Sequence, residues 1–276
     1  MGRQHPNVSN SQTFAATDYH IMMGYMAGYC MYSGNNNIFI GRECGESIYS
    51  GSDNVCMGYR AGRGSTSFSN GTFIGSHAGN NITGGENTCI GRHSGAGIGG
   101  YSANTCVGYQ SGRHAHHYNT CIGHHAGYNC YGSRNTYLGY YAGHQSTSGS
   151  GNVAIGSNAG YHNTGSNNVS IGYHAGYHTY GDEGCVNIGY HAGYGNGTNN
   201  TTSSYGVNIG YNTGRYINSG QGNINMGYHA GYHNYTGAYN VMIGYHAGAC
   251  NQSGSNNICM GQDAGRSLYQ GYDNIF

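Results

Sequence analysis

The sequence predicts an all-β protein folded as a parallel β-solenoid (β-roll) of about 15 coils of about 17 residues each. The main evidence for this fold is a pattern, aliphatic-Gly-x-x-small-Gly, that recurs along almost the whole chain. Most copies begin 15 to 17 residues apart, and one gap is 21 residues. Regular self-similarity at a short period is typical of repeat architectures. The aliphatic residues are Met23, Ile40, Met57, Ile74, Ile90, Val107, Ile122, Leu138, Ile155, Ile171, Ile188, Ile209, Met226, Ile243 and Met260.

Composition supports strands over helices as the repeating element. The chain of 276 residues contains 54 Gly and one Pro. A helical repeat would lose roughly 1 kcal/mol for each Gly relative to Ala. Coils of a β-solenoid stack about 4.8 Å apart. Fifteen of them would therefore form a rod on the order of 70 Å long.

A three-residue strand is expected just before the first glycine of each copy. The residue two before the aliphatic is Ile, Val or Thr in almost every copy, as in Val169-Ser170-Ile171. Positions two apart share one face of a strand. We therefore expect Val169 and Ile171 to point inward and Ser170 to point outward.

The two glycines are expected to mark the corners of each coil, with two short strands between them. Gly follows the aliphatic in every copy, which indicates backbone bends that other residues avoid. The small residue between the glycines, usually Ala, can pack in a narrow interior. A long insertion at 195–202 is predicted to bulge out as a loop.

An asparagine three before the aliphatic is expected to form a ladder along the rod. Stacked amides can bond to one another and to the turn backbone. The clearest run is Asn87, Asn104, Asn119, Asn135, Asn152 and Asn168.

Two regions are predicted: an irregular N-terminal arm at 1–19 and a solenoid domain at 20–276. The last residues, Asp273-Asn274-Ile275-Phe276, begin another copy of the repeat. We hypothesise that the next subunit completes this coil through residues 1–22, which would give head-to-tail strand addition.

Charge excludes several classes of protein. Only 7% of residues are charged, Lys is absent and the net charge is zero. Nucleic-acid binding needs a basic surface, so no nucleic-acid partner is expected.

No apolar run is long enough for membrane insertion, and no signal peptide is visible. The few carboxylates, such as Glu43, Glu46 and Asp263, look isolated, and no catalytic motif occurs, so neither an enzyme nor a cofactor is expected.

The unit Asn168-Val169-Ser170-Ile171-Gly172-Tyr173-His174-Ala175-Gly176 resembles the head repeats of trimeric autotransporter adhesins of the YadA type. It is also similar to the IGxxAG repeats of phage tail-fibre-like proteins. Residues 71–79 and 152–160 carry the match best, and the likeness covers about residues 20–276. The resemblance implies a left-handed β-roll. It says little about a ligand.

Three columns of chemically distinctive side chains are expected to recur from coil to coil. Cysteines between the two strand positions should form an outward inter-coil or inter-chain thiol row, either packed as small side chains or joined by disulfides. Tyrosines after the first glycine should form an aromatic ladder, structural or available to another rod or a glycan. Histidines before the small residue are weak metal candidates, and the alternative is a polar stack. The thiol row is Cys89, Cys106 and Cys121, and the aromatic ladder is Tyr173, Tyr190, Tyr211, Tyr228 and Tyr245. The histidine candidates are His77, His93, His174, His191, His229 and His246.

A run of threonines at one repeat position suggests ice binding as a further function. We expect these side chains to point inward, because Val and Ile fill the same position elsewhere, and this weighs against an ice-binding face. The run is Thr72, Thr88, Thr105, Thr120 and Thr136.

The leading interpretation is a non-enzymatic structural subunit of a self-assembling extracellular or virion-surface fibre. Its partner would be itself, as a head-to-tail polymer with lateral association or a trimer. One alternative is a trimeric adhesin head that binds a receptor or glycan. Another is metal or small-ligand binding through the His and Tyr ladders.

Overall fold

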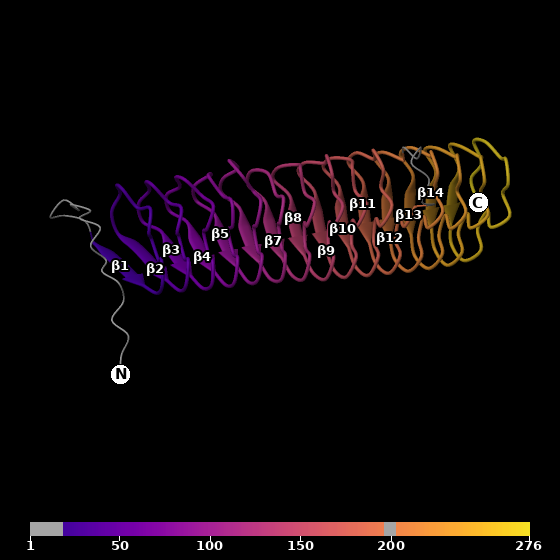
Figure 1. The fold of residues 1–276 in the computed structure, drawn as a ribbon. Helices are drawn as coiled ribbons and strands as arrows, with labels where there is room; N and C mark the ends of the chain where they lie inside the picture. The colour runs from indigo at the N-terminus through magenta and orange to yellow at the C-terminus, as the bar shows by residue number, and fades with distance from the viewer. Residues whose placement is uncertain (1–18, 196–202) are drawn as a thin grey trace.

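The computed structural model describes residues 19–195 and 203–276 and confirms the predicted all-β solenoid (Figure 1). The strands form one parallel sheet in sequence order, and about 14 turns connect them. The strands are β1 (His20–Met23), β2 (Asn37–Ile40), β3 (Val55–Met57), β4 (Thr72–Ile74), β5 (Thr88–Ile90), β6 (Thr105–Val107), β7 (Thr120–Ile122), β8 (Thr136–Leu138), β9 (Val153–Ile155), β10 (Val169–Ile171), β11 (Val186–Ile188), β12 (Val207–Ile209), β13 (Ile224–Met226), β14 (Val241–Ile243) and β15 (Ile258–Met260).

The register follows the sequence repeat. Ile171 pairs with Ile155 on one side and with Ile188 on the other. The 21-residue gap does not disturb this alignment, because Ile188 pairs with Ile209 across it. Of the segment predicted to bulge there, 196–202 lie outside the described residues, as do residues 1–18 of the predicted arm.

Each coil has one regular strand, so the prediction of two strands per coil was wrong for the described residues. Opposite the sheet the coils touch through isolated bridges, such as those from Ser50 to Ser33 and to Ser67. The turn after each strand contains a residue with positive φ, for example His174 at 52°. A backbone in this left-handed region cannot continue a strand.

The glycine corners have a steric cause. Gly172 has a φ of 129°, and a Cβ there would lie 2.5 Å from the carbonyl oxygen of Gly189 in the next coil. The second glycine, Gly176, has a φ of 55°, and a Cβ there would overlap Oγ of Ser170 inside the tube. Both sites therefore need glycine for conformation and for space.

The direction of the strand side chains is the reverse of the prediction. Ser170 is fully buried, whereas Val169 and Ile171 are only half-buried on the outer surface. A three-residue strand sends one side chain to one face and two to the other. Because the tube is narrow, the single middle residue points inward and the two branched residues point outward.

The interior changes character along the rod. Towards the N-terminus it is apolar, with Phe39, Phe73 and Tyr137 fully buried among cysteines and alanines. From β11 to β13 the middle residues are asparagines that form an internal ladder, which the repeat pattern alone did not reveal. Asn208 donates to the side-chain oxygen of Asn187 at 2.8 Å, and Asn225 donates to Asn208 at 2.8 Å.

The asparagines before the strands form a second, longer ladder at the turn. The backbone N–H of Asn152 donates to Oδ1 of Asn135 at 2.8 Å, and that of Asn168 donates to Oδ1 of Asn152 at 2.9 Å. Nδ2 of Asn152 donates to the Gly165 carbonyl at 2.8 Å. The same column contains buried Asn87, Asn104, Asn119, Asn135, Asn152 and Asn168. Each amide thus joins neighbouring coils and satisfies buried turn groups.

Candidate functional site: the outer sheet face and the ring columns

The outer sheet face is formed by the two outward residues of each strand. Its exposure is substantial for such side chains, with Leu138 at 43% and Ile90 at 37%. The two outward positions of the strands form two parallel rows of side chains, and neither row contains a charged residue. The first row is Ile21, Ile38, Val55, Thr72, Thr88, Thr105, Thr120, Thr136, Val153, Val169, Val186, Val207, Ile224, Val241 and Ile258; the second is the aliphatic series from Met23 to Met260.

The threonines lie on this outer face, so the prediction that they point inward was wrong. Thr88 is half-buried and Thr105 is exposed, while the cysteines beside them are fully buried. In-register pairing aligns the whole run from Thr72 to Thr136. The face therefore combines a central patch of hydroxyl and methyl groups with aliphatic side chains on both sides.

The cysteine row lies inside the tube and not on its surface. Cys89, Cys106 and Cys121 occupy paired positions on three consecutive strands, are fully buried and are free thiols. Burial raises the pKa of the Cys89 thiol well above its usual value. Contact with another chain is therefore excluded for these thiols in the folded protein, which corrects the predicted outward row.

The tyrosine ladder (Tyr173, Tyr190, Tyr211, Tyr228 and Tyr245) is a continuous ring stack on the edge beside the sheet. Ring centroids lie 4.9–5.3 Å apart and the planes differ by 3–13°. The rings are 41–49% exposed. Because the faces cover one another, solvent meets mainly the ring edges and the hydroxyl groups.

A second ring column occupies the position after the second glycine in five consecutive coils and was not among the predicted columns. It contains Tyr128, His144, Tyr161, Tyr177 and Tyr194, with centroids 5.0–5.2 Å apart. Burial raises the pKa of Tyr161 and of Tyr177. The signal was present in the sequence, since the residue after the second glycine is Tyr in several consecutive repeats.

The six histidine candidates form three close ring pairs between neighbouring coils, two of them stacked and one tilted. The ring centroids are 4.8 Å apart for His77 and His93, and 5.1 Å apart for His174 and His191. His229 and His246 lie 5.3 Å apart. Ring nitrogen lone pairs lie in the ring plane, so stacked rings do not converge on one ion. Within 19–195 and 203–276, no three His, Cys, Asp or Glu residues are placed to hold a metal.

Burial makes the histidines of this edge poor bases. It lowers the pKa of His77, His93, His174 and His229, and brings that of His191 to about 4. Neutral imidazoles can stack without repulsion, whereas protonated rings in neighbouring coils would repel one another.

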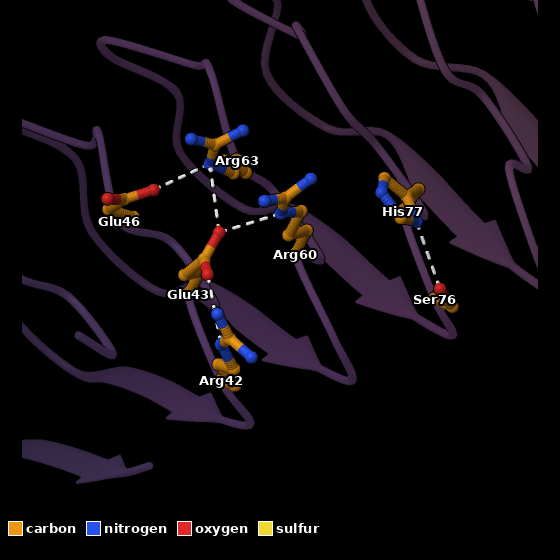
Figure 2. A network of polar contacts seen from close by, with 7 residues as sticks. All are labelled: Arg42, Glu43, Glu46, Arg60, Arg63, Ser76 and His77. Carbon is orange, nitrogen blue, oxygen red and sulfur yellow. Dashed lines mark hydrogen bonds and ion pairs between the residues drawn. The ribbon is translucent and has the colours of Figure 1, made fainter. Parts of the chain in front are cut away.

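In the coils of β2 and β3, charged residues take several of the positions that carry His or Tyr further along the rod, and they form an ion-pair network (Figure 2). Glu43 accepts from Nε of Arg60 at 2.6 Å and from Nε of Arg42 at 3.0 Å, and its side chain is 8% exposed. The hydrogen bond from Arg60 lowers the pKa of Glu43. Glu46 accepts from Nε of Arg63 at 2.5 Å. These carboxylates are therefore not isolated, contrary to the prediction; Glu43 and Arg60, 17 residues apart, share one column.

Comparison of the chain with known protein families, curated proteins and solved structures finds no match. In the part of the chain that the structure describes, no helix has the length and apolarity needed to cross a membrane.

Proposed function

We propose that this protein is a non-enzymatic structural subunit of an extracellular or virion-surface fibre, and that copies associate through the outer sheet face. The observation that carries the proposal is the uncharged surface that runs along all fifteen strands and is aliphatic except for its central threonines. Contiguous apolar patches of this size mark interaction sites in soluble proteins. The extracellular or virion setting is supported by the resemblance of the repeat alone.

The dimensions of the face suit a second copy of the same chain. Fifteen strands about 4.8 Å apart and three residues wide give about 70 by about 10 Å, or on the order of 700 Å² per copy. A standard interface buries about 800 Å² per partner. The face carries no charged side chain, so two copies can pair without repulsion or unpaired ions.

End-to-end stacking would extend such pairs into a fibre. The contacts between consecutive coils repeat the same Asn and backbone hydrogen bonds along the rod. A coil of one copy can therefore meet a coil of another with the geometry already used inside the chain. Such a contact joins unlike ends and does not close, which favours filaments.

One feature supports the adhesin-head alternative: three copies could also pack around a three-fold axis through the same outer sheet face. Glycan binding through the tyrosine ladder is less well supported. Sugars stack on exposed ring faces, whereas in this ladder neighbouring rings cover those faces.

Ice binding is a second candidate, favoured by the outward position of the five threonines. Together with the aliphatic row they form a lattice of about 4.8 by about 6.7 Å, which could order a layer of water. Thermal hysteresis in the wild-type protein that is lost on Thr105→Lys would support it. Unchanged freezing behaviour of the wild-type protein would exclude it.

The test of self-association is sedimentation velocity of the whole chain over a range of concentrations. Ile90→Glu with Leu138→Glu places two charges on the outer face, about three strand spacings apart. Matched glutamates at exposed turn positions, Thr147 and Gln252, leave that face unchanged. Circular dichroism verifies that both variants remain folded.

We expect the wild type and the turn variant to form pairs or longer polymers, and the face variant to sediment as a monomer. Discrete trimers would favour the adhesin-head alternative. A wild-type monomer at every concentration, or a face variant that associates as the wild type does, would refute the proposal.

A further inference from the structure

A notch of about 140 Å³ lies near the C-terminal end of the rod, at the positions that carry the second ring column in earlier coils. In the preceding coil the two residues after the second glycine are aromatic, Tyr232 and His233, and in the following coil they are Arg266 and Ser267. In the coil between them these residues are Ala249 and Cys250, so neither position carries a ring like those of the preceding coil. Ala249 is only 7% exposed and forms part of the floor.

The walls of the notch are a ring on one side and a cation on the other. Tyr232 belongs to the preceding coil and Arg266 to the following coil. Two coil spacings separate these residues, or about 10 Å. Rings in the intact column stack 5.0–5.2 Å apart. The gap therefore has room for one additional ring plane between them.

The chemistry of the walls specifies the occupant. Tyr232 stacks on His229 with centroids 4.5 Å apart, which holds its ring in a fixed orientation. The Arg266 side chain is 53% exposed and donates to Oδ1 of Asp263 at 3.1 Å. A guanidinium has five donors, and its planar shape suits both a ring face and a carboxylate.

We propose that this notch binds small planar aromatic acids, with the ring in the place of the missing tyrosine and the carboxylate on Arg266. This site lies on the ring columns and not on the outer sheet face, so it does not depend on self-association. The neighbouring Asp263 carboxylate limits the attraction for an anion, and the notch is open. The dissociation constant is therefore expected to be on the order of 1 mM.

Saturation-transfer NMR on the whole chain tests the site with 4-hydroxybenzoate as the probe. Cyclohexanecarboxylate, a non-planar acid, and phenol, a ring without a carboxylate, are the matched compounds. Ala249→Tyr fills the notch with the residue that other coils have at this position, so it should fold normally. Ala96→Tyr is the matched variant, because Ala96 occupies the equivalent position in a coil near the other end.

We expect Ala249→Tyr to weaken 4-hydroxybenzoate binding by at least about tenfold, and Arg266→Gln to weaken it severalfold. Ala96→Tyr should bind as the wild type does, and the two matched compounds should bind more weakly than the probe. The proposal is overturned if the wild type shows no binding at about 10 mM. It is also overturned if Ala249→Tyr binds equally well, or if cyclohexanecarboxylate competes equally.

Discussion

Replacement of one ladder asparagine, Asn152→Ala, should destabilise the rod far more than its small change in volume suggests. The side chain of Asn152 donates to the Gly165 carbonyl at 2.8 Å and accepts from the Asn168 N–H at 2.9 Å. Asn152 is fully buried. The substitution leaves one backbone donor and one backbone acceptor without these partners.

The magnitude follows from the cost of unpaired buried groups. Each buried donor or acceptor left without a partner costs about 1–3 kcal/mol. Two such groups predict a loss of about 2–6 kcal/mol in the free energy of unfolding. In a solenoid the loss falls on the interfaces of one coil with its neighbours, because stability is a sum of nearest-neighbour contributions. Unfolding should therefore separate into two transitions when this interface becomes the weakest.

Urea denaturation followed by circular dichroism measures this loss. Gln252→Ala, which removes an exposed amide, is the matched control and should change stability by less than about 0.5 kcal/mol. A change of that small size for Asn152→Ala would show that the asparagine ladder does not hold the coils together.

Three further results are expected. Burial lowers the pKa of His178 from 6.5 to about 4, so its stabilising contribution is complete above pH 6.5 and is lost as the pH falls towards 4; the melting temperature should drop over that range. Gly172→Ala should lower the free energy of unfolding by at least about 3 kcal/mol, because its φ of 129° and its closeness to Gly189 both oppose a Cβ. A thiol reagent should label Cys30 and Cys250 quickly in the native protein, and the eight buried cysteines only on unfolding.

Each of these results has a control. His178→Gln should reduce the dependence of the melting temperature on pH, and an unchanged dependence would refute the role of this ring. Gly100→Ala, where the nearest atom to an added Cβ is Thr83 Oγ1 at 3.7 Å, should be close to neutral. Rapid labelling of more than two thiols would show that the interior opens in the native state.

The period and register were predictable because they depend on backbone chemistry. Gly172 is required by φ and by contact with the next coil, and the Asn column requires one amide per coil. Both constraints recur at the period of the coil, so the sequence displays them directly. The same period predicts that Ile171 lies beside Ile188, and the two residues do pair in the sheet.

The direction of the strand side chains could not be predicted from polarity alone. Ser170 points inward and Ile171 outward because the tube has room for one side chain per strand, and the middle residue of the three takes that place. The same inward position holds Phe39 and Tyr137 in other coils, so neither polarity nor size marks it. Apolar residues are usually buried, but an apolar face can also lie outward and serve as an interface. The sequence pattern is the same in both cases.

The ring columns and the charge network were only partly predictable. The tyrosine ladder followed from a single repeated position. The pairing of Glu43 with Arg60 and the stacking of Tyr161 on Tyr177 are visible in the sequence only when the repeats are aligned and each position is compared from coil to coil. Where the column changes residue type, as at Ala249, only the structure shows that a notch opens.

The most direct test of the outer sheet face is the labelling rate of Ile122→Cys in a chain where Cys30 and Cys250 are replaced by Ser. Ile122 is 36% exposed on this face, next to the buried Cys121. We predict rapid labelling in dilute protein and strong protection at high concentration, where copies pair. Slow labelling at every dilution would place this residue inside the tube, and fast labelling at every concentration would show that no copy covers the face.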